Sequence, residues 1–143
     1  MEFFSGLQIS ASGMMAERRR LETISSNISN ANTHQIEGQP LYKAQRLVTA
    51  PAESQFKKYL AGFRELPGQG VSVMGVAQEE LPPRMVYEPG HPDADENGYV
   101  AYPDINVLDE MVHAITASRS YEANLTTFNE TKRMLTKALE IGK

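Results

Sequence analysis

The distribution of helix-breaking residues divides this chain of 143 residues into three parts. Residues 34–103 hold all eight prolines and seven of the ten glycines, whereas residues 1–32 and 104–143 contain no proline. A proline inside a helix destabilises that helix by about 3 kcal/mol. The sequence therefore predicts a mainly α-helical protein with an N-terminal helix in residues 1–33, an extended or β-containing middle in residues 34–103, and a C-terminal helix in residues 104–143.

The C-terminal segment has the stronger helical pattern. A series of ten positions spaced 4-3-4-3 runs through it without a slip, and this is the spacing of a coiled-coil seam. Asn106 precedes the series and can act as a helix N-cap. Eight of the ten positions are apolar: Val107, Met111, Ala114, Tyr121, Leu125, Phe128, Leu135 and Leu139.

The N-terminal segment has a shorter apolar series, which Arg18 and Ser25 interrupt. Its apolar members are Leu7, Ala11, Met14, Leu21 and Ile28. We expect the two terminal helices to pair as a coiled coil, because an isolated helix is marginally stable in water. The longer series would extend beyond this partner. All thirteen residues are therefore candidate interface residues, with part of the C-terminal series left for other copies or other proteins.

Short β-prone segments occur in the middle of the chain. Residues 41–48 predict an edge strand, and residues 70–76 predict a strand with a possible bulge at Gly75. Residues 85–87 and 99–101 flank a turn-rich loop. Residues 55–66 fit either a short helix or a disordered segment.

Composition argues against several classes of function. The 14 basic and 18 acidic residues leave no basic stripe for nucleic acid, and Arg18–Arg20 is the only basic run. The chain has no cysteine, and no nucleophile elbow or phosphate-binding loop is present. No apolar stretch is long enough for a membrane span. We expect a protein that is not an enzyme and has no cofactor.

One loop matches part of a calcium-binding pattern. Residues 93–98, DADENG, and Asp104 at position twelve fit the spacing of oxygen ligands in an EF-hand. The prolines before Asp93 forbid the entering helix, so we expect a turn, and a calcium-binding module is the alternative. His34, His91 and His113 are far apart in the sequence and predict scattered histidines rather than a metal site.

Three blocks of the sequence resemble one family. Residues 9–16 read ISASGMMA and residues 26–33 read SNISNANT, which is similar to the N-terminal signature of bacterial flagellar rod and hook proteins. Residues 118–124, SRSYEAN, resemble the matching C-terminal block. Residues 86–103, which begin VYEPGHPDAD, narrow the resemblance to the proximal rod type.

The resemblance implies a structural subunit of the flagellar basal-body rod, which transmits torque from the motor to the hook through the periplasm. The implied partners are other copies of the chain, other rod proteins, basal-body ring and adaptor proteins, and the flagellar type III export apparatus. Export by that apparatus would need no cleaved signal peptide. A different axial protein of the flagellum, such as another rod subunit, is the alternative within the same class.

Overall fold

The computed structural model describes residues 2–36, 38–52 and 70–141. Its regular elements are two long helices and four short strands. In chain order they are α1 (Glu2–Asn30), β1 (Gln45–Pro51), β2 (Val71–Gln78), β3 (Arg84–Tyr87), β4 (Tyr99–Tyr102) and α2 (Val107–Ile141). This arrangement confirms the predicted fold class, with two helices at the ends of the chain and a small β region between them.

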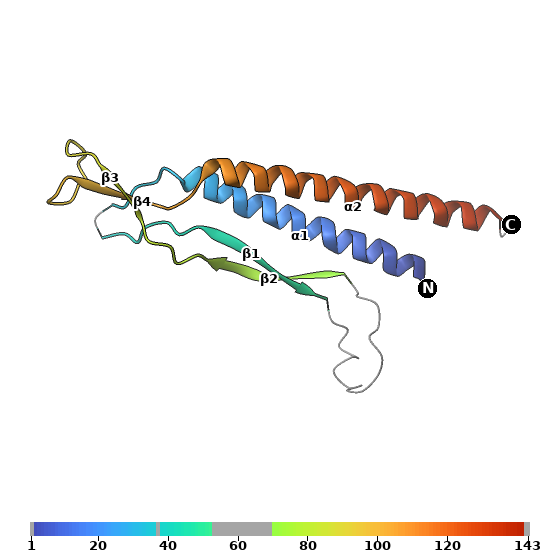
Figure 1. Cartoon of the computed structure of the whole chain (residues 1–143). Helices are drawn as coiled ribbons and strands as arrows, with labels where there is room; N and C mark the ends of the chain where they lie inside the picture. The colour runs from blue at the N-terminus through green and yellow to red at the C-terminus, as the bar shows by residue number, and fades with distance from the viewer. Residues whose placement is uncertain (1, 37, 53–69, 142–143) are drawn as a thin grey trace, which may run out of the picture.

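The elements form an elongated molecule (Figure 1). The helices α1 and α2 lie side by side and run in opposite directions, so the two ends of the chain lie at the same end of the molecule. The hairpin of β1 and β2 packs on α1, on the side away from α2. The hairpin of β3 and β4 lies at the far end of the helix pair.

Polar side chains mark the start of α2 and the end of α1. The backbone N–H of Leu108 donates to Oδ1 of Asn106 at 3.0 Å, which caps the start of α2 as expected. Asp109 and Glu110 lie in its first turn, where negative charge is favourable. At the exit of α1, Asn30 Nδ2 donates to the carbonyl of Ser26 at 2.8 Å, within a cluster of polar residues that ends the helix.

β1 and β2 pair in antiparallel fashion with one irregularity. Val48 lies opposite Gly75 and Thr49 lies opposite Val73, so Met74 is the extra residue of a bulge beside Gly75. The bulge occurs where the sequence predicted it, and Gly75 has a φ of 154°. The strand predicted for residues 41–48 instead occupies Gln45–Pro51. The prediction for residues 55–66 lies outside the described residues.

β3 and β4 form the second antiparallel pair, with a register from Arg84 opposite Tyr102 to Tyr87 opposite Tyr99. This pairing confirms the two short strands that the sequence predicted around the turn-rich loop. Val100 on β4 is fully buried. The carbonyl of Ala101 accepts a hydrogen bond from the backbone N–H of Gln35 at 2.9 Å, which ties the hairpin to the segment that follows α1.

The apolar core of the described residues is small. Its buried apolar members are Ala16, Ile24, Ala31, Ala44, Val100 and Ala117. Four of these six are alanines, each of which removes little apolar surface from water. Burial inside a single copy therefore supplies only a modest hydrophobic stabilisation, and most of the large apolar side chains lie outside the core.

Candidate assembly interface

Small side chains form the contact between the two helices. A Cβ atom added to Gly13 would lie 2.9 Å from Nδ2 of Asn124, and one added to Gly6 would lie 3.8 Å from Cγ2 of Thr131. At the other end of the pair, Asn27 Nδ2 donates to Glu110 Oε2 at 3.1 Å. These pairs show one continuous antiparallel register. The glycines allow the helices to approach closely without burying large apolar side chains between them.

On α2, the predicted apolar series contributes only partly to this contact. The buried residues of α2 are Glu110, Ala117 and Thr131. They alternate with half-buried members of the predicted series, which are Ala114, Tyr121, Phe128 and Leu135. Val107 is also half-buried. The remaining members are exposed, with fractions of 51% for Met111, 40% for Leu125 and 75% for Leu139. α2 thus turns one flank of its predicted seam towards α1 and leaves the other flank open.

On α1, all five predicted residues are half-buried: Leu7, Ala11, Met14, Leu21 and Ile28. The fully buried residues are neighbours of this series, namely Ser10, Ala16, Thr23, Ile24 and Asn27. Their spread around the helix follows from the position of α1, which has α2 on one side and the hairpin of β1 and β2 on the other (Figure 1).

A buried carboxylate connects three elements near the start of α2. Glu110 is 2% exposed. Its Oε1 accepts a hydrogen bond from Nη1 of Arg46 on β1 at 2.6 Å, and Arg46 Nε also donates to Glu79 Oε1 at 3.1 Å. Burial alone would lower the pKa of Arg46, but the hydrogen bonds and charges of these two glutamates outweigh it and raise the pKa above its ordinary value. Arg46 therefore stays charged and holds β1 against the helix pair.

Asn27 completes this polar cluster from the side of α1. Its Oδ1 accepts hydrogen bonds from the backbone N–H of Gln45 at 2.8 Å and from the hydroxyl of Tyr42 at 3.0 Å. Its Nδ2 donates to the carbonyl of Gln45 at 2.9 Å as well as to Glu110. Periodicity could not identify this cluster, because a search for apolar spacing passes over polar residues.

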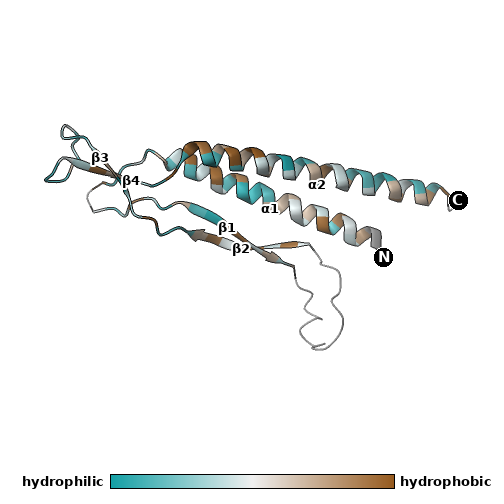
Figure 2. Cartoon of the chain, viewed as in Figure 1, coloured by the Kyte–Doolittle hydropathy of each residue, from teal (hydrophilic) through white to brown (hydrophobic). Residues whose placement is uncertain are grey.

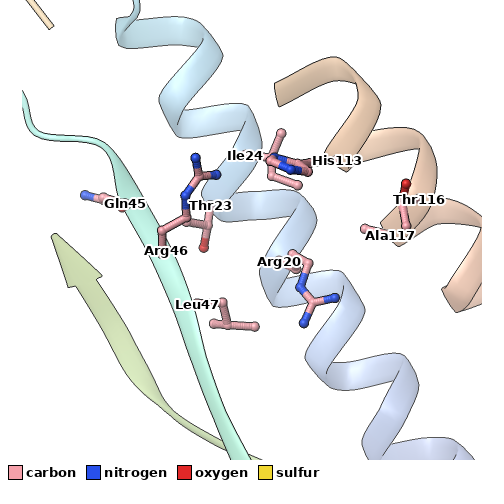
Figure 3. Close-up of a pocket in the computed structure, with 9 residues that line it drawn as sticks. All are labelled: Arg20, Thr23, Ile24, Gln45, Arg46, Leu47, His113, Thr116 and Ala117. Atoms are coloured by element: carbon pink, nitrogen blue, oxygen red, sulfur yellow. The ribbon is translucent and has the colours of Figure 1, made fainter. Parts of the chain in front are cut away.

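A cavity of about 390 Å³ opens where α1, α2 and β1 meet (Figure 3). Thr23 and Ile24 line it from α1, Leu47 from β1 and Ala117 from α2. Arg20, Gln45, Arg46, His113 and Thr116 complete the lining. Both arginines are engaged by carboxylates, since Arg20 pairs with Glu17 at 3.0 Å and Arg46 pairs with Glu79 and Glu110. The cavity is thus a recess between packed elements with its charges already paired.

A group of exposed large apolar residues lies on the first turns of α2. Leu108, Met111, Val112 and Ile115 are 72%, 51%, 60% and 55% exposed. Their spacing places all four on one face of the helix, and the buried Glu110 and Ala117 lie on the opposite face. We call these four residues the outer patch. Figure 2 shows the same concentration of hydrophobic residues at this end of α2.

A second exposed apolar set lies on β2. Val71, Val73, Met74 and Val76 are between 38% and 68% exposed. β2 belongs to a two-stranded sheet, so its edge away from β1 is unpaired within that sheet. Exposed strand edges with apolar side chains commonly pair with other chains. The described surface therefore offers two candidate places for contact with other proteins.

The loop that resembles a calcium site has an internal role in the structure. Asp95 Oδ1 accepts hydrogen bonds from the backbone N–H groups of Asn97 and Tyr99, both at 2.8 Å. Gly98 has a φ of 81°, which favours glycine in this turn. These contacts are those expected of an Asp- and Asn-rich turn. They support the turn that the sequence favoured over an EF-hand.

Comparison with known proteins assigns the chain to a family. Residues 7–34 match the family described as flagella basal body rod protein. Residues 96–141 match the family described as flagellar basal body rod FlgEFG protein C-terminal. The two matches correspond to α1 with its exit and to β4 with α2. No described helix is both long enough and apolar enough to span a membrane.

Full-length relatives point to the same family. The chain is 36% identical to the flagellar basal-body rod protein FlgC of Borreliella burgdorferi, over 99% of this chain and 98% of the relative. It is 36% identical to FlgC of Bacillus subtilis and 38% identical to FlgC of Salmonella typhimurium, each over the full length of both chains. The chain therefore belongs to the FlgC family of flagellar basal-body rod proteins, whose members are structural components of the flagellar basal body rather than enzymes.

Proposed function

We propose that this chain polymerises into the proximal part of the flagellar rod by burying the outer patch of α2 against neighbouring subunits. The observation that carries the proposal is the exposure of four large apolar side chains on one face of a helix whose opposite face is already packed. A contiguous apolar patch of this kind is unusual on a monomeric protein and marks an interaction site. Because the patch is remote from the α1 contact, assembly can proceed without opening the helix pair.

The remaining exposed members of the predicted seam extend this surface along α2. Leu125 and Leu139 belong to the predicted series, and Met134 and Ile141 are also exposed. These residues are distributed along the helix towards its C-terminal end, so one subunit could contact several neighbours. Head-to-tail contacts of this kind build open helical assemblies. A rod formed in this way would transmit torque through many shared interfaces.

The proposed partners are other copies of the chain, other rod proteins, and the ring and adaptor proteins of the basal body. The relatives of this chain are themselves named as flagellar basal-body rod proteins. We further propose that the flagellar type III apparatus exports the chain to the periplasm without removing a signal peptide. Detection of the chain with its first residues intact in purified basal bodies would test this route.

A charge placed in the outer patch tests the assembly surface. Ile115→Asp should prevent incorporation into basal bodies and abolish swimming, because a carboxylate cannot be buried in an apolar contact without a partner. The free energy of unfolding of the single chain should change by no more than about 0.5 kcal/mol, because the Ile115 side chain is exposed. Basal bodies purified from a strain that carries the variant, and the thermal unfolding of the purified chain, measure the two effects.

Asn129→Asp is the matched control, since it adds the same charge at an exposed polar position of the same helix. It should support normal assembly. Normal rods built from the Ile115→Asp chain would show that the outer patch is not a subunit interface.

A further inference from the structure

The structure brings together two histidines and an aspartate that are far apart in the sequence. His34 lies in the segment after α1, whereas His91 and Asp93 lie in the loop between β3 and β4. One ligand atom from each residue, two imidazole nitrogens and a carboxylate oxygen, lies within 4.8 Å of the other two. The sequence predicted three scattered histidines, but the structure places His34 and His91 next to each other.

Two of the three distances between ligand atoms of this cluster are close to those around a bound metal ion. His34 Nε2 lies 3.0 Å from Asp93 Oδ2, and His91 Nδ1 lies 3.8 Å from the same oxygen. Ligand atoms on a tetrahedral ion such as Zn²⁺, with bonds of about 2.1 Å, lie roughly 3.4 Å apart. The two observed distances lie on either side of this value. Small rotations of the three side chains would therefore bring the atoms onto one ion.

Backbone contacts hold the cluster in place. The N–H of Asp93 donates to Nδ1 of His91 at 3.1 Å, which directs an unprotonated nitrogen of that ring towards Asp93. The N–H of His91 donates to the carbonyl of Glu88 at 3.0 Å, and the bond between Gln35 and Ala101 fixes the segment next to His34. The rings of His34 and His91 are 4.5 Å apart between centroids. The cluster is thus formed by a folded loop and a tethered segment, rather than by independent surface side chains.

We propose that His34, His91 and Asp93 bind a divalent transition-metal ion of the Zn²⁺ type, with water as the remaining ligand. Two imidazole nitrogens and one carboxylate oxygen favour such an ion over Ca²⁺ or Mg²⁺, which prefer oxygen ligands. The three side chains are 23–30% exposed, so solvent reaches the site. The ion would replace the contact between His34 and Asp93 and the hydrogen bond that His91 Nδ1 accepts. It would fasten the β3–β4 hairpin to the exit of α1.

Titration of the full-length, chelator-treated chain with Zn²⁺ in a calorimeter tests the site. One ion should bind per chain, and His34→Ala, His91→Ala and Asp93→Asn should each weaken binding at least about tenfold, because the loss of a ligand should cost no less than the loss of a residue that only supports a ligand. His113→Ala and Asp109→Asn are matched controls outside the cluster and should bind as the unchanged chain does. Ca²⁺ at the same concentration should not compete.

Nuclear magnetic resonance of the unchanged chain with labelled histidines gives a second measurement that needs no variant. Zn²⁺ should shift the ring signals of His34 and His91 and leave those of His113 in place. Binding should weaken when the pH falls from 7.5 to about 6, because protons compete for the imidazole nitrogens. No binding at 1 mM Zn²⁺, equal affinity in the cluster variants, or ring shifts confined to His113 would each overturn the proposal.

Discussion

The two helices of this protein have similar lengths but different surroundings. α1 is enclosed by α2 on one side and by the hairpin of β1 and β2 on the other, and five of its residues are fully buried. α2 is longer, yet only Glu110, Ala117 and Thr131 are buried. The exposed large apolar residues show the reverse distribution, with three described on α1 and eight on α2. α1 is therefore enclosed mainly within the subunit, whereas α2 carries most of the exposed large apolar residues of the helix pair.

The comparison also shows how two helices can pair while the large apolar side chains of one helix stay exposed. Glycine, alanine, threonine and asparagine residues supply part of the contact between α1 and α2, and a polar cluster fixes one end of it. Such a contact needs few large apolar residues. The leucine, isoleucine and methionine side chains of α2 then remain outside, where burial by a neighbour would contribute about 1.5–3 kcal/mol for each one fully covered.

The largest expected effect on the single subunit comes from the polar cluster that joins the two helices. Glu110→Ala should lower the free energy of unfolding by about 3–5 kcal/mol, because it removes the buried carboxylate that accepts hydrogen bonds from both Arg46 and Asn27. Urea unfolding of the purified chain measures this change. Glu122→Ala, which removes an exposed carboxylate from the same helix, should change it by no more than about 0.5 kcal/mol. Equal effects of the two variants would contradict a central role for the cluster.

A pair of isoleucines tests the difference between the helices directly. Ile24 on α1 is 4% exposed, and Ile115 on α2 is 55% exposed. Ile24→Ala should destabilise the chain by about 3 kcal/mol through the lost burial and the cavity left behind. Ile115→Ala should change the stability of the single chain by no more than about 0.5 kcal/mol. If both substitutions lowered the stability of the dissociated chain equally, α2 would be as enclosed as α1. The difference described between the two helices would then be wrong.

A pair of glycines gives the smallest effects, and these should differ in sign. Gly6→Ala should stabilise the chain by about 0.5–1 kcal/mol, because alanine favours a helix and the added Cβ has ordinary contact with Thr131. Gly13→Ala should destabilise it by about 1 kcal/mol, since the Cβ would crowd Asn124 by more than the gain in helix propensity offsets. Thermal unfolding of both variants measures the difference. A stabilising Gly13→Ala would show that the Asn124 side chain moves aside and that Gly13 is not needed for the contact between the helices.

Much of the fold could be predicted from local sequence. The proline-free ends predicted both helices, Asn106 predicted the start of α2, and the region around Gly75 predicted the bulge in β2. Each of these features depends on residues within one or two helical turns or on one strand. The first residue of β1 was less predictable, because the pairing with β2 decides where that strand begins.

The candidate interface was predictable only in part. Apolar spacing identified residues such as Leu125 and Leu139, which are exposed, and Tyr121, which is half-buried against the helix pair. It could not tell these two environments apart, because an apolar series looks the same whichever side meets the partner helix. The outer residues Leu108, Val112 and Ile115 were not part of the predicted series, although their spacing with Met111 is visible in the sequence.

The sequence by itself determined where the helices and turns form and which family the chain resembles, since these depend on short-range geometry and on contiguous motifs. Only the tertiary structure decided which flank of α2 is covered. It also brought Asn27 to Glu110 across 83 residues and His34 to Asp93 across 59. The physical reason is that helix periodicity fixes directions around one axis, whereas the relative rotation of two helices depends on how their side chains fit together.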